Sequence, residues 1–81
     1  MLHLTCYAVV KRGEARQRLL NALNRKSVPF TVDANRVSVD AHFCSYKSVD
    51  RVLEYFEQTD AEERGFSLMS YGKEVVDHDS G

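Results

Sequence analysis

The sequence predicts an α+β fold in which two helices cover one face of a four-stranded antiparallel sheet. Three observations lead to this prediction: an early segment with strict two-residue alternation, a hairpin whose two faces agree on one register, and two segments of helical periodicity that separate the strands. The elements therefore follow in the order strand, helix, strand, strand, helix, strand.

The first strand is predicted over residues 2–10, where every even-numbered residue is apolar. The odd-numbered residues begin with the polar His3 and Thr5 and continue with Tyr7 and Val9. Such alternation is typical of a sheet that is covered on one side only. We therefore expect the even-numbered residues in the core and Tyr7 on the open face.

The first helix is predicted over residues 14–25, because the spacing of apolar residues becomes helical there. Gly13 is an acceptable N-cap, and Pro29 prevents the helix from continuing into the next strand. The apolar stripe of this helix consists of Ala15, Leu19, Leu20, Ala22 and Leu23.

A β-hairpin is predicted over residues 30–43. With a two-residue loop, Val32 faces Val37 and Phe30 faces Val39 on the apolar side, while polar residues face each other on the opposite side. A slip by one residue would expose the valines, so the pattern indicates a single register.

The second helix is predicted to follow Ser48, its expected N-cap, with an apolar stripe of Val49, Val52, Leu53 and Phe56.

The last elements are a short helical turn at residues 59–62, which has capping-box spacing, and a strand at residues 66–71. Phe66 and Leu68 are expected on the core side of that strand. The single domain would then span residues 1–72, and residues 73–81 would form a short C-terminal tail.

This order of elements is the ferredoxin-like βαββαβ arrangement, in which the first strand lies between the third and the last. A looser α+β fold and a thioredoxin-like half are the alternatives. Residues 4–33 end in the return Val-Pro-Phe-Thr-Val-Asp, and this opening resembles that of small glutaredoxins. The segment where that family carries Cys-x-x-Cys reads Val-Lys-Arg-Gly here, so the resemblance implies no redox activity.

Composition indicates a soluble globular domain: 43% of the residues are hydrophobic, 28% are charged, and the net charge is −1. No apolar run approaches the roughly 20 residues that span a bilayer. The first residues also lack a signal-peptide pattern, so we expect a cytoplasmic protein that does not contact membranes. Cys6 and Cys44 belong to no paired motif and are expected to be buried thiols.

Charge is unevenly distributed along the chain. Up to Lys26, six basic residues stand against one acid and give +5, whereas from Asp50 onward nine acids stand against three basic residues and give −6. Such asymmetry indicates a basic and an acidic surface, each suited to a charged partner.

Motifs for catalysis or for cofactor binding are absent from the sequence. Hydrolase signatures and a glycine-rich phosphate loop are missing, and the histidines do not have the spacing of metal ligands. Asp40 and His42 share the outward face of one strand, but they lack a nucleophile and a pocket. We therefore expect no catalytic residues, no cofactor and no metal.

Nucleic acid is the alternative partner, because a ferredoxin-like sheet with open-face aromatics is the RNA-recognition design. Tyr7 and Tyr71 would stack bases, but the third strand presents no outward aromatic residue and carries Asp40. The remaining route to RNA or single-stranded DNA is the basic first helix, with Arg16, Arg18, Arg25 and Lys26.

Protein binding is the function that the sequence favours, because tyrosine, methionine and arginine are enriched at interface centres. One candidate surface is the open sheet face with Tyr7, Met69 and Tyr71, which would also suit a homodimer. The other is the acidic second helix with Glu54, Tyr55, Glu57 and Glu62.

The chain is thus predicted to be a small non-enzymatic protein-binding module. In size and in its acidic helix it resembles the small anti-host and anti-defence inhibitors of phages. That resemblance implies an inhibitor or regulator of a larger macromolecular machine.

Overall fold

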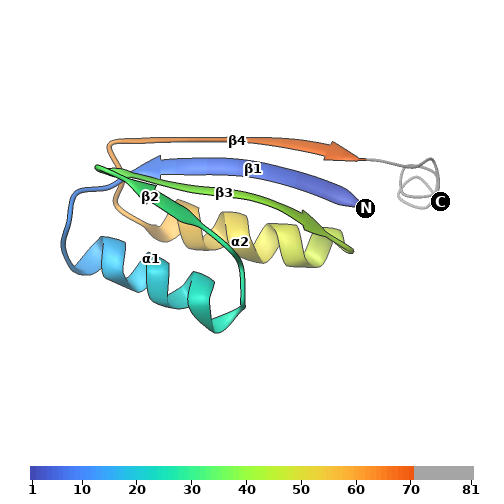
Figure 1. Ribbon diagram of the computed structural model, residues 1–81, viewed down its shortest axis with the longest axis horizontal. Coiled ribbons are helices and arrows are strands. Elements are labelled where there is room, and N and C mark those ends of the chain that lie inside the picture. The colour runs from blue at the N-terminus through green and yellow to red at the C-terminus, as the bar shows by residue number, and fades with distance from the viewer. Residues whose placement is uncertain (71–81) are drawn as a thin grey trace.

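The computed structural model describes residues 1–70 and contains four strands and two helices in the predicted order. The elements are β1 (Leu2–Val9), α1 (Glu14–Arg25), β2 (Thr31–Asp33), β3 (Arg36–Phe43), α2 (Tyr46–Gln58) and β4 (Glu63–Ser70). The sheet order is β2-β3-β1-β4, and both helices lie on one face of the sheet (Figure 1). The predicted ferredoxin-like α+β fold is confirmed. Tyr71 and the predicted tail at residues 73–81 lie outside the described residues.

Strand β1 occupies the centre of the sheet. It pairs antiparallel with β3 on one side and with β4 on the other over its whole length. Its side chains alternate as predicted: Leu2, Leu4, Cys6 and Ala8 are buried under the helices. Burial of these apolar side chains is the main favourable contribution of β1 to the free energy of folding.

The hairpin has the predicted register, with Val32 opposite Val37 and Asp33 opposite Arg36. Strand β2 has only three residues, however, and Phe30 precedes it. The core position predicted for Val32 is wrong, because its side chain is 42% exposed. Strand β2 is an edge strand and has a neighbouring strand on one side only.

Helix α1 has the predicted bounds, whereas α2 begins two residues before the predicted cap. Ser45 is the N-cap, and its Oγ accepts a hydrogen bond from the Ser48 backbone N–H at 3.3 Å. The prediction of Ser48 as the cap is therefore wrong. The apolar stripe of α2 is confirmed, with Val49, Val52 and Phe56 buried.

The segment between α2 and β4 contains bends but no helical turn, so the predicted helical turn at residues 59–62 is wrong. Thr59 caps α2 in an extended conformation, and its hydroxyl donates to the Tyr55 carbonyl at 2.8 Å. The Arg64 guanidinium donates to the Glu57 carbonyl at 2.7 Å and to the Thr59 carbonyl at 3.2 Å. These bonds satisfy carbonyl groups that a helix end leaves without partners.

Strand β4 begins at Glu63, three residues earlier than predicted. Phe66 and Leu68 lie opposite Cys6 and Leu4 and so share the helix side of the sheet. The predicted side of Phe66 is therefore confirmed, but its side chain is 62% exposed and is not part of the buried core. The physical reason is that β4 is the second edge strand, at the border of the helix layer.

The core lies between the helices and the sheet. The largest fully buried side chains are Leu2, Leu4, Leu19, Leu23, Val37, Val39 and Val49. Cys6 is buried as predicted, but Cys44 follows the end of β3 and is exposed, which corrects the prediction of two buried thiols. Within residues 1–70, neither helix has the length and apolar character of a membrane span.

Candidate functional site

On the open face of the sheet, the Tyr7 side chain contacts Glu63, Arg36 and Gly65. Its hydroxyl donates to Glu63 Oε2 at 2.6 Å, and the Arg36 guanidinium carbon lies 4.3 Å from its ring centroid. The hydrogen bond to Glu63 raises the pKa of Tyr7, and the negative charge of Glu63 adds to this effect while Arg36 opposes it. The ring also crosses Gly65, where a Cβ would lie 2.7 Å from Tyr7 Cε1. This tyrosine is therefore engaged within the domain.

A second cluster on the open face joins β1 to β3. The rings of His3 and His42 stack with centroids 4.5 Å apart, and His3 Nε2 lies within hydrogen-bond distance of Asp40 Oδ1. No group of three His, Cys, Asp or Glu in the described part of the chain could hold a metal ion. Next to His3 on the other side, Met69 of β4 is 53% exposed. Met69 thus remains accessible on this face.

The four residues of the predicted acidic surface lie in different places. Glu54 and Glu57 are exposed on α2, but Tyr55 is half-buried on the side of α2 that faces α1. Glu62 precedes β4 and lies 3.8 Å from Lys11 Nζ. The structure therefore does not gather these residues into one continuous patch.

Of the four basic residues predicted for nucleic acid, two have partners inside the domain. Arg16 donates to the Ala34 carbonyl of the hairpin turn at 2.9 Å, and Arg18 bonds Glu14 at 3.1 Å. Arg25 and Lys26 are exposed at the end of α1.

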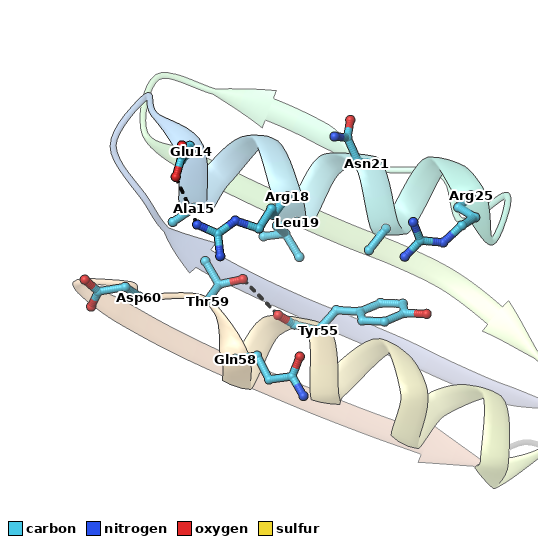
Figure 2. A pocket seen from close by; sticks show the side chains of 11 residues that line it. Glu14, Ala15, Arg18, Leu19, Asn21, Arg25, Tyr55, Gln58, Thr59 and Asp60 are labelled. Atoms are coloured by element: carbon cyan, nitrogen blue, oxygen red, sulfur yellow. Dashed lines mark hydrogen bonds and ion pairs between the residues drawn. The ribbon is translucent and has the colours of Figure 1, made fainter.

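A groove of about 670 Å³ separates α1 from α2 (Figure 2). Its floor is apolar, because Ala15, Leu19 and Ala22 of α1 lie along it. The remaining lining residues are Glu14, Arg18, Asn21, Arg25, Tyr55, Gln58, Thr59 and Asp60. The groove thus brings together residues that the sequence had placed in two competing hypotheses.

The outer edge of β4 is the other candidate site. The Val10 N–H bonds the Asn35 carbonyl on the β3 side, and the Val9 carbonyl accepts from the Glu62 N–H on the β4 side. Odd-numbered residues of β1 therefore bond toward β4, since backbone groups in a strand alternate in direction. Each odd-numbered residue of β1 lies opposite an odd-numbered residue of β4, so the backbone groups of those β4 residues form hydrogen bonds with β1.

The even-numbered residues of β4 consequently direct their N–H and C=O groups away from the sheet. These residues are Arg64, Phe66, Leu68 and Ser70. No other strand in residues 1–70 pairs with this edge. Beside it, a hollow of about 220 Å³ lies between α2 and β4, with Leu53, Phe56 and Phe66 in its lining.

Sequence reasoning missed Phe66 as a surface residue and missed the groove between the helices. The uncharged run at residues 65–70 was a usable signal for an unprotected edge. No sequence pattern indicated the groove, because it depends on the distance between two helices.

Comparisons with protein-family models, with curated proteins and with solved structures gave no match. The function proposed below therefore rests on the geometry of residues 1–70.

Proposed function

We propose that this chain is a small non-enzymatic protein-binding module that pairs with an extended segment of its partner along the edge of β4. The observation that carries this proposal is the exposure of Phe66, 62% accessible on an eight-residue edge strand. An edge strand offers a row of backbone donors and acceptors to an added strand.

The last six residues of β4 contain neither the charged residues nor the proline that often protect a sheet edge. Natural proteins place charged residues, proline or a bulge on exposed edges to prevent unwanted pairing. Here Glu63 and Arg64 stand at the start of the strand, and residues 65–70 contain neither charge nor proline. An unprotected edge of this length is expected where pairing is the function.

Both faces of β4 offer side-chain contacts next to the free backbone groups. On the helix side, Phe66 borders the hollow lined by Leu53 and Phe56. On the open side, Met69 is 53% exposed. Side chains of an added strand point alternately to the two faces, so they would contact these two places in turn.

Two observations favour a protein over nucleic acid as the partner. One face of the Tyr7 ring is covered by Arg36, and its edge crosses Gly65, which hinders base stacking. Arg16 and Arg18 already have partners within the domain. A module of this kind can inhibit or regulate a larger macromolecular machine by occupying a strand edge of one subunit.

The test compares proteins captured by the tagged wild type with those captured by Phe66→Lys. Lysine is a natural edge-protecting residue, and the change also removes the exposed ring, so we expect about a tenfold loss of the specific partner. The matched control is Val32→Lys, which replaces another exposed apolar residue by lysine on the short edge strand β2 and should retain the partner. Circular dichroism checks that both variants fold.

Amide hydrogen exchange then locates the contact. Binding of the captured partner should slow exchange at Phe66 and Leu68, whose N–H groups lie on the outer edge, more than at Ser67, which already bonds β1. Equal capture by wild type and Phe66→Lys would refute the proposal. Capture that is abolished by nuclease would instead support the nucleic-acid alternative.

A further inference from the structure

We infer that the groove between α1 and α2 is a second binding site, which takes an acidic protein segment with its carboxylates on Arg18 and Arg25. This site is separate from the edge of β4, and its evidence is independent of the function proposed above.

The two arginines are spaced so that each can bind one carboxylate group of the same peptide. They are seven residues apart on α1, which is about two turns or 10 Å of helix. Figure 2 shows both of them on the side of α1 that faces α2. The Arg25 side chain forms no ion pair with any of residues 1–70, and Arg18 holds only Glu14 at 3.1 Å. A guanidinium group binds a carboxylate through two parallel hydrogen bonds.

Neighbouring groups in the groove suit a peptide rather than a bare ion. The Tyr55 hydroxyl makes no hydrogen bond within the described residues and lies in the groove, as Figure 2 shows. Gln58 lines the same wall and offers an amide. Between them and α1, the groove ends on Leu19 and Ala22, whose side chains are almost fully buried in the core. The exposed hydrogen-bonding groups are therefore the Tyr55 hydroxyl and the Gln58 amide, which can bond the backbone amides of a peptide.

Charge at the other end of the groove distinguishes a peptide from nucleic acid. Glu14 and Asp60 lie on opposite walls toward that end, away from Arg25 (Figure 2). A nucleic-acid strand carries a charge at every phosphate, so these carboxylates would repel part of it. A peptide can place its acidic residues at the Arg25 end and neutral or basic residues at the other. The groove is therefore complementary to a segment with uneven charge.

The probe is a fluorescein-labelled dodecapeptide with alternating glutamate and leucine in one half and alternating serine and leucine in the other, measured by fluorescence anisotropy on the full chain. Arg25→Glu should weaken its binding about tenfold or more, because it replaces an attractive charge by a repulsive one. The matched control is Arg51→Glu, which makes the same charge change on α2 outside the groove and should alter binding by less than about twofold. Glu14→Gln should strengthen binding, because it frees Arg18 and removes a repelling carboxylate.

Amide chemical shifts recorded during the titration should move at Arg25, Tyr55 and Gln58. The inference would be overturned if Arg25→Glu and Arg51→Glu weakened peptide binding equally. It would also be overturned if a labelled twelve-nucleotide oligothymidylate bound more tightly than the peptide and its binding depended on Arg25. The absence of peptide binding would overturn it as well.

Phe66→Lys separates this inference from the proposed function. If that variant loses the peptide while Arg25→Glu keeps it, the peptide pairs with β4. The groove site then fails while the β4 proposal stands.

Discussion

Gly65 lies where the side chain of Tyr7 crosses from β1 to β4. A Cβ at this position would lie 2.7 Å from Tyr7 Cε1. This distance is shorter than a van der Waals contact between two carbon atoms, so one of the two groups would have to shift. Tyr7 can move only by weakening its hydrogen bond to Glu63 and its contact with Arg36. The glycine is thus required by its neighbour on the next strand.

We expect Gly65→Ala to lower the free energy of unfolding by about 1–2 kcal/mol, the usual cost of overpacking. Urea denaturation followed by circular dichroism measures the change. In a Tyr7→Ala background the same substitution should cost much less, because the obstructing ring is gone. An equal cost in both backgrounds would show that the ring is not the cause.

The two cysteines differ in burial and therefore in reactivity. Burial raises the pKa of the Cys6 thiol to about 12, so this thiol stays protonated well above neutral pH. Cys44 is exposed. Because the thiolate is the nucleophile, a thiol reagent at about pH 8 should label Cys44 rapidly and leave Cys6 unmodified in the folded protein.

Mass spectrometry of the labelled protein checks this prediction. Cys44→Ser should remain unlabelled until denaturant is added. Rapid labelling of native Cys44→Ser would contradict the burial of Cys6.

At the scale of the elements, the start of α2 depends on Ser45. Ser45→Ala removes the oxygen that accepts the Ser48 N–H, and we expect a loss of about 1 kcal/mol in the free energy of unfolding. Ser48→Ala is the comparison, because it keeps that backbone N–H and should cost less. Urea denaturation of both variants measures the difference, and a larger effect of Ser48→Ala would contradict the assignment of the cap.

Much of the element order could be predicted because each segment carries its own periodicity. The stripe of α1 and the pairing of Val32 with Val37 are local patterns, and both are confirmed. The cap of α2 was ambiguous, since Ser45 and Ser48 have the same chemistry. The choice depends on where β3 ends, which is at Phe43.

The start of β4 could not be predicted, because its first residues do not alternate. Glu63 and Gly65 join the strand through their pairing with Val9 and Tyr7, which are more than fifty residues away in sequence. Phe66 shows the same limit, since alternation gives the side of the sheet but not how far the helices extend. The candidate sites therefore followed from the packing of whole elements.

At the scale of the whole molecule, the strands should differ in local stability. Strand β1 is paired on both sides, whereas β2 has three residues and one neighbour. Amides of β1 should exchange with solvent most slowly and those of β2 fastest among the strands, because edge segments open without the rest of the sheet. Hydrogen exchange followed by nuclear magnetic resonance tests this order. Equal protection of β1 and β2 would contradict it.

The central place of β1 also has a consequence for biosynthesis. A ribosome makes this strand before the rest of the sheet, at about 5–20 residues per second. Its first neighbour, β3, starts at Arg36, and its second, β4, starts only at Glu63. During translation, one edge of β1 therefore stays unpaired until β4 has emerged from the ribosome. A nascent chain stalled before Glu63 would expose that edge to chaperones.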